Sequence, residues 1–205
     1  MTIRAHKGDL PNLDNYRVKA VAIDTETLGL VPHRDRLCVV QLSPGDGTAD
    51  VVQIAKGQTS APNIEALLAD PAIEKIFHFG RFDIAVMEHA FGVRANPVFC
   101  TKIASRLTRT YTDRHGLKDI CNELLDVQLS KQQQSSDWAA DELSPAQLEY
   151  AASDVLYLHA LRDALAGRLE REGRTEMAEA CFRFLPMRAR LDLDGWPEAD
   201  IFAHS

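Results

Sequence analysis

Residues Val18–Thr27, VKAVAIDTET, pass from a short apolar segment into two acids that are two positions apart. The β-branched residues at the start of this stretch predict a buried strand over Val18–Asp24. Side chains two residues apart share a face of a strand, so Asp24 and Glu26 are expected side by side at its end. Two such carboxylates repel each other unless a cation compensates, and Mg²⁺ and Mn²⁺ prefer oxygen ligands of this kind. The stretch therefore predicts either a metal-binding edge or a solvated strand end.

Further strands and helices are predicted downstream of this stretch. Short β-branched segments alternate there with turn residues, and apolar spacing indicates helices between them. The predicted strands are Leu37–Leu42, Asp50–Ile54, Lys75–His78 and Val98–Phe99, and the predicted helices are Pro62–Ala69 and Arg81–Phe91. Strands mixed with helices, followed by a helical second half, predict an α/β core with extra helices packed against it.

The clearest helical pattern runs from Pro145 to about Arg171. Ser144 is a good N-cap, Pro145 suits the first helical position, and Gln147 completes a capping box. At 100° per residue, five apolar positions fall on one stripe: Ala151, Val155, Leu158, Leu165 and Leu169. This stripe predicts a helix that lies on the core.

Three more polar side chains join the two acids of the strand. Tyr150 and Asp154 are four residues apart on the late helix and project beside its apolar stripe. Alone, such a pair most simply indicates a structural hydrogen bond. Asp83 stands in the first turn of the helix that follows Gly80, where an acid also complements the helix dipole. The order of these residues along the chain is more specific than any one of them.

Composition indicates a single globular domain. The chain has 205 residues, is 45% hydrophobic and carries a net charge of −7. We expect one domain over residues 1–205, with its core at about residues 18–171 and a C-terminal helix and tail over residues 174–205. The last helix is predicted near Thr175–Arg190, and the tail from Leu191 onward is expected to be irregular.

The acidity argues against a protein that binds nucleic acid over its whole surface. Charge is nevertheless uneven, because residues 102–118 carry five basic residues and one acid. Lys102, Arg106 and Arg109 would form a basic stripe on a helix, which could follow a nucleic-acid strand or simply face solvent.

The start of the chain lacks a leader pattern, and no apolar run reaches the length of a membrane span. We therefore expect a cytoplasmic protein without a membrane partner. The four cysteines are far apart and form no C-x-x-C pair, which favours buried thiols over a zinc site or a disulfide framework.

Three motifs together resemble the DEDD superfamily of 3′-5′ exonucleases, in its tyrosine-containing, ribonuclease D-like branch. The motifs are Ala22–Thr27 (AIDTET), His78–Asp83 (HFGRFD) and Tyr150–Asp154 (YAASD). The intervening stretches Gly116–Ile120, Leu129–Lys131 and Ser136–Trp138 match as well. The branch that contains histidine would place it five residues before the last acid, where this chain has Glu149.

The resemblance implies an RNase H-like mixed sheet flanked by helices, with two divalent ions, Mg²⁺ or Mn²⁺, at the acids. Asp24 would be shared by both ions. Glu26 and Asp154 would hold the ion that carries the attacking water, and Asp83 would hold the second ion. Tyr150 would orient the water. These five residues are thus the expected catalytic set.

The same resemblance implies substrate contacts. Backbone groups around Thr27 and the side chain of Leu28 would contact the terminal nucleotide, and Lys131 would lie near a phosphate. Thr27 stands where many relatives carry Phe, which bears on this contact surface. Ribonuclease D also has additional helical RNA-binding domains after the nuclease core, and this chain is expected to have none.

The expected substrate is a nucleic acid with a free 3′ end, cleaved to nucleoside 5′-monophosphates. RNA is favoured, and DNA ends of the repair or proofreading type are the alternative. A non-catalytic module that binds nucleic acid or a protein partner is the alternative from another class. The presence of all four acids and the tyrosine disfavours it. The sequence leaves the oligomeric state open.

Overall fold

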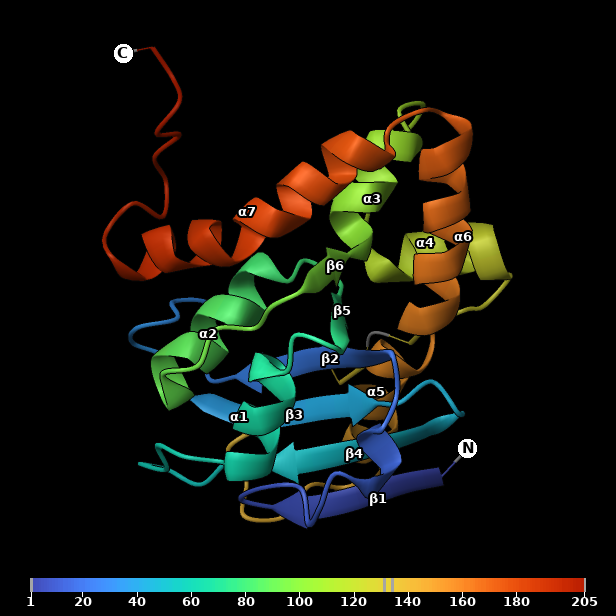
Figure 1. The fold of residues 1–205 in the computed structure, drawn as a ribbon. Coiled ribbons are helices and arrows are strands. Elements are labelled where there is room, and N and C mark those ends of the chain that lie inside the picture. The colour runs from blue at the N-terminus through green and yellow to red at the C-terminus, as the bar shows by residue number, and fades with distance from the viewer. Residues whose placement is uncertain (1, 131, 134, 205) are drawn as a thin grey trace.

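The computed structural model describes residues 2–204 except 131 and 134. Its centre is a six-stranded sheet with the order β1-β4-β3-β2-β5-β6 (Figure 1). The strands are β1 (Thr2–Lys7), β2 (Ala20–Thr27), β3 (Leu37–Ser43), β4 (Thr48–Gln53), β5 (Glu74–Phe77) and β6 (Val98–Cys100). β3 runs antiparallel to β2 and β4, and the other neighbours are parallel. The expected mixed sheet is confirmed.

Helices cover both faces of this sheet and dominate the second half of the chain, as expected. They are α1 (Pro62–Ala69), α2 (Arg81–Phe91), α3 (Thr101–Thr108), α4 (Leu117–Leu125), α5 (Pro145–Leu156), α6 (Leu158–Arg171) and α7 (Thr175–Leu193). Figure 1 shows α1 and α2 in front of the sheet and α5 behind it. In the described part of the chain, no helix combines the length and apolar character needed to cross a membrane.

Strand β3 explains how the sheet is held between these layers, because all of its residues are buried. Val40 and Leu42 belong to the main core on the side of α1 and α2. Val39 lies in a second cluster with Trp138 and with Ala151 of α5. Alternate residues of β3 thus pack into two cores on opposite faces of the sheet. Burying each side chain of this kind contributes roughly 1.5–3 kcal/mol to the stability of the folded state.

The single helix predicted over Pro145–Arg171 is wrong in one respect, because α5 and α6 are separate helices that meet at Tyr157. The capping box of Ser144 and Gln147 is confirmed. The predicted apolar stripe also stays buried across the joint. α5 packs on β3 and β4, whereas α6 packs on α3 and α4. Neither glycine nor proline stands at the joint, and the break coincides with this change of packing partners.

Other boundaries differ from expectation by a few residues. β2 ends at Thr27, so Asp24 and Glu26 lie inside the strand. α7 continues to Leu193, and the tail that was expected to be irregular from Leu191 begins after it. The sequence pattern does not indicate β1, because this edge strand is mostly polar and none of its described residues is fully buried.

Candidate active site

Three carboxylates meet between the sheet and α5. Asp24 and Glu26 project from β2 on one face, since residues two apart in a strand point the same way. Asp154 reaches them from α5. One carboxylate oxygen from each residue lies within 4.8 Å of the others. Oxygens at this spacing can share a divalent cation.

Asp83 reaches the same region from the first turn of α2, on the opposite face of the sheet. Its Oδ1 accepts a hydrogen bond of 2.6 Å from Thr25 Oγ1. Because side chains alternate along β2, Thr25 points away from the face that carries Asp24 and Glu26. Asp83 therefore stands beside the group of three rather than within it, and it is only 4% exposed.

The four acids, here called the acid cleft (Asp24, Glu26, Asp83 and Asp154), all have raised pKa values. Burial is the largest cause throughout. It raises the pKa of Glu26 to about 8 and those of Asp83 and Asp154 to about 7, and the pKa of Asp24 lies well above its usual range. Repulsion from the neighbouring carboxylates adds to the effect at Asp24 and Glu26.

A divalent ion fits this group of side chains on chemical grounds. A bound cation would offset both the desolvation and the mutual repulsion of the carboxylates. The clustered donors are all carboxylate oxygens, which hard ions such as Mg²⁺ and Mn²⁺ prefer.

Tyr150 lies one helical turn before Asp154, so the two side chains project from neighbouring positions on α5. Burial, followed by the charge of Asp154, raises the pKa of Tyr150 above its ordinary value. The phenol therefore stays protonated at neutral pH. Its ring packs against Trp138, with ring centroids 6.0 Å apart. Only the match over Ser136–Trp138 hints at Trp138 in the sequence, and no spacing rule links it to Tyr150.

The acid cleft opens into a cavity of about 530 Å³, a size within the usual range for small-molecule sites. Thr27, Leu28 and Leu30 line one part of it, and His78 and Phe79 line another. Leu28 is 55% exposed and Leu30 is 84% exposed, so both present apolar surface to a ligand. Lys131, the other expected substrate contact, lies outside the described residues.

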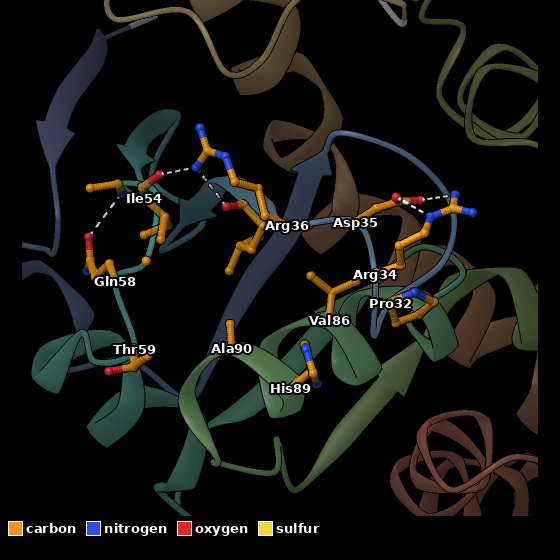
Figure 2. A pocket seen from close by; sticks show the side chains of 13 residues that line it. Pro32, Arg34, Asp35, Arg36, Ile54, Gln58, Thr59, Val86, His89 and Ala90 are labelled. Carbon is orange, nitrogen blue, oxygen red and sulfur yellow. Dashed lines mark hydrogen bonds and ion pairs between the residues drawn. The ribbon is translucent and has the colours of Figure 1, made fainter.

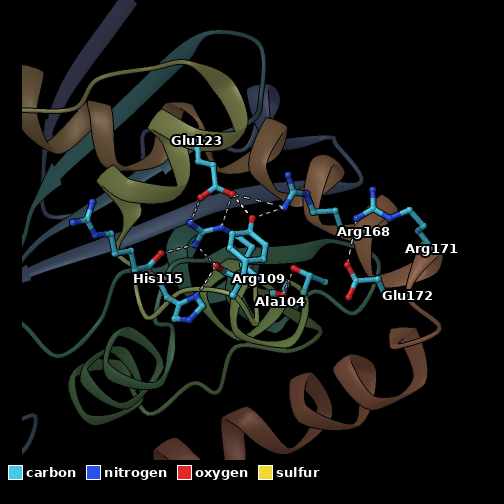
Figure 3. A network of polar contacts seen from close by, with 11 residues as sticks. Ala104, Arg109, His115, Glu123, Arg168, Arg171 and Glu172 are labelled. Carbon is cyan, nitrogen blue, oxygen red and sulfur yellow. Dashed lines mark hydrogen bonds and ion pairs between the residues drawn. The ribbon is translucent and has the colours of Figure 1, made fainter.

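The basic stripe predicted from Lys102, Arg106 and Arg109 is wrong for its third member. α3 ends at Thr108, and Arg109 is 1% exposed. Its guanidinium donates to Glu123 of α4 and, at 3.0 Å, to the hydroxyl of Ser105. Figure 3 shows Glu123 between Arg109 and Arg168. Regular spacing cannot reveal that the helix ends before the last basic residue.

A second hollow of about 230 Å³ lies beside α2, next to Arg34, Arg36 and His89 (Figure 2). Arg34 pairs with Asp35 at 2.7 Å, and Arg36 donates to the carbonyl of Ile54 at 2.9 Å. None of its lining residues belongs to the acid cleft. Its arginines are thus engaged locally, and the metal-binding chemistry belongs to the larger cavity.

Comparison with known proteins agrees with this geometry. A family model described as a 3′-5′ exonuclease matches residues 11–170. The ribonuclease D of Granulibacter bethesdensis is 38% identical over 154 residues, which make up 75% of this chain and 38% of that protein. The chain thus spans well under half the length of this curated relative.

Solved structures are similar over most or all of the chain. Brucella melitensis NrnC with bound Mg²⁺ has a TM-score of 0.97 and 74% identity, with 100% of both chains covered. The same protein bound to pGG has a TM-score of 0.98 and 75% identity. Escherichia coli RNase D, an exoribonuclease involved in structured RNA processing, has a TM-score of 0.77 and 28% identity over 90% of this chain and 49% of that one.

Proposed function

Because the chain belongs to the 3′-5′ exonuclease family, in its ribonuclease D-like branch, we propose that it hydrolyses RNA from the 3′ end and releases nucleoside 5′-monophosphates. The observation that carries this proposal is the convergence of Asp24, Glu26 and Asp154, whose oxygens lie within 4.8 Å of one another, with Asp83 beside them. Such a cluster is expensive to bury without a cation, so its chemistry points to metal-assisted cleavage.

The acid cleft would hold two divalent ions. Asp24 would be the shared ligand, Glu26 and Asp154 would complete one site, and Asp83 would belong to the second. When bound, the ions supply charge for activating water and stabilising the leaving 3′-oxygen. Mg²⁺ is supported by its presence in the similar NrnC structure.

The protein's own groups would position the reactants. The protonated hydroxyl of Tyr150, one helical turn from Asp154, would orient the attacking water. Leu28 and the backbone around Thr27 would contact the terminal nucleotide at the cavity rim. Lys131 stays a predicted phosphate contact outside the described residues.

RNA is the favoured substrate because of the ribonuclease D relatives. The similar NrnC structure holds pGG, a 5′-phosphorylated dinucleotide, which supports a short strand as the substrate. DNA ends remain the alternative. The single-domain organisation and the cytoplasmic location also stay predictions.

The test is digestion of matched RNA and DNA strands, labelled at either end, with Mg²⁺, with Mn²⁺ or with EDTA. We expect loss of single nucleotides from a free 3′-hydroxyl, faster on RNA, and no cleavage in EDTA. Replacing the exposed Asp14 by Asn serves as a carboxylate control outside the acid cleft. Cleavage of circular single strands as fast as linear ones would show an endonuclease and contradict the proposal.

A further inference from the structure

Phe79 joins β5 to α2 in a backbone conformation that is unusual for a bulky residue. Its φ is 65°, in the left-handed region. The next residue is Gly80, where an added Cβ would lie 2.6 Å from the Cβ of Phe77. The backbone conformation of Phe79 and the close approach at Gly80 both describe a tight turn. Phe79 is nevertheless 47% exposed. Strained residues of this kind gather at functional sites.

Phe79 lines two cavities at once. One is the cavity of the acid cleft. The other, of about 220 Å³, lies between the start of α2, α3 and α7. Four basic residues line this second cavity, which we call the basic cavity: Arg81, Lys102, Arg106 and Arg188. Among the described residues that line it, none is acidic.

The positive charge of the basic cavity is only partly neutralised. Arg81 and Arg188 share the carboxylate of Asp192, at 2.7 and 3.0 Å. Lys102 places its Nζ 4.2 Å from the centroid of the Phe79 ring, and Arg106 is exposed. Within the described residues, neither of these two has an ion-pair partner. In a chain of net charge −7, two such cations at the edge of an acidic cavity form a local site for an anion.

We propose that Phe79 and the basic cavity bind the nucleotide on the 5′ side of the scissile bond. Its base packs against the Phe79 ring, and a strand phosphate lies by Lys102 and Arg106. This inference rests on the proposed nuclease function, because such an enzyme must hold the strand upstream of the bond that it cuts. The carboxylates of the acid cleft repel phosphates, so the strand needs cations at the point where it leaves the cleft. An aromatic ring can stack with any of the bases.

Another cavity borders the acid cleft at Leu28 and Trp138 and also has basic residues in its lining. There Lys7 pairs with Glu142 at 2.6 Å, and Asp141 is part of the lining. Arg36 and Lys56 also line it and have no ion-pair partner among the described residues, so charge alone does not separate the two cavities. The aromatic residue of this lining, Trp138, is only 3% exposed, whereas Phe79 is 47% exposed. This difference favours the side of Phe79 for the upstream strand.

The kinetic test compares two substrates that differ only upstream of the bond. One is a dinucleotide that ends in uridine, and the other is the p-nitrophenyl ester of uridine 5′-monophosphate, whose leaving group is not a nucleotide. In Phe79→Gly and in Lys102→Met combined with Arg106→Met, we expect kcat/KM to fall about tenfold more for the dinucleotide than for the ester, mainly through KM. Lys56→Met is the matched basic control, since Lys56 lines the other cavity.

Glycine adopts a φ of 65° without strain, so Phe79→Gly removes the ring without disturbing the turn. A melting temperature at or above that of the wild type would show that weaker dinucleotide cleavage does not come from unfolding. Phe79→Tyr keeps the ring and should retain most of the discrimination between the two substrates.

Binding gives a readout that does not depend on catalysis. The affinity for a labelled RNA strand is measured by fluorescence anisotropy in EDTA over a range of salt concentrations. The slope of the log binding constant against the log salt concentration should become about 0.7 shallower for each phosphate contact removed in the double variant. If the wild type cleaves both substrates and the variants cleave both as well as the wild type, or lose the same factor in kcat/KM on both, this inference is overturned and the nuclease function stands. A wild type that cleaves neither would overturn the function itself.

Discussion

Charge is buried in two regions of the molecule, with opposite consequences. In the acid cleft, burial and neighbouring carboxylates raise the pKa of Glu26 to about 8. In the Arg109 network (Arg109, Tyr111, Glu123 and Arg168), the hydrogen bond from Arg109 lowers the pKa of Glu123 to about 2. The network satisfies its charges internally and so stabilises the fold. The acid cleft leaves like charges together, and only something from outside the chain can compensate them.

The largest contrast should appear in turnover. Asp24→Ala or Asp154→Ala should lower the rate of RNA cleavage by about 10³-fold or more, since each removes several kcal/mol of transition-state stabilisation. Glu123→Ala should change the rate little, because Glu123 belongs to the network. Single-turnover digestion of a labelled strand measures both. Near-full activity of Asp24→Ala would remove the basis for the mechanism.

Variants of the two regions should differ in how much a metal ion stabilises them. With Mn²⁺ at about 100 times its Kd, one site that forms only in the folded state adds about 2.7 kcal/mol, or roughly 5–10 °C in Tm for a chain of this size. The combination of Asp24→Ala with Asp154→Ala should lose this shift, while Glu123→Ala should keep it. Equal shifts in all three proteins would mean that the ions bind elsewhere.

The two regions should also respond to pH with opposite signs. In EDTA, Glu26 has a folded pKa of about 8 against an ordinary 4.5, so the folded state holds the extra proton between these values. Stability should therefore fall as pH rises from 5 to 8, by an amount on the order of 2 kcal/mol after allowance for partial exposure. Glu123 has its pKa lowered to about 2, so its contribution should be lost as pH falls from about 4.5 to 2.

Urea unfolding at several pH values in EDTA checks both signs. Glu26→Gln should flatten the decline between pH 5 and 8, and Glu123→Gln should flatten the acid limb alone. A wild type that gains stability from pH 5 to 8 in EDTA would show that the acids of the cleft are not held as the structure has them.

The smallest effect concerns the network itself. Glu123→Ala leaves the guanidinium of Arg109, which is 1% exposed, without its carboxylate. Because the Glu123 side chain is 36% exposed and solvent screens the pair, we expect a loss of about 1–2 kcal/mol in unfolding free energy rather than the larger cost of a fully buried pair. Glu142→Ala, which breaks an exposed pair with Lys7, should cost almost nothing. Equal losses would mean that burial does not set the strength of the network.

The spacing of residues along the sequence predicts much of the candidate site. The two-residue spacing of Asp24 and Glu26 in a strand, and the four-residue spacing of Tyr150 and Asp154 on a capped helix, predict which side chains lie together within each element. The structure then brings the two pairs to one place. Their catalytic roles stay predictions until the variants are measured.

The sequence by itself determined the strand that holds Asp24 and Glu26, the capped helix that holds Asp154, and the family to which the chain belongs, because each depends on residues close together or on an ordered set of motifs. Only the tertiary structure decided that helix α5 ends at Leu156, that Arg109 turns inward to Glu123, and that Phe79 stands between an acidic and a basic cavity. Periodicity determines only which side chains of a single helix or strand lie side by side. These outcomes depend instead on which elements, distant in the chain, compete for the same space and the same charges.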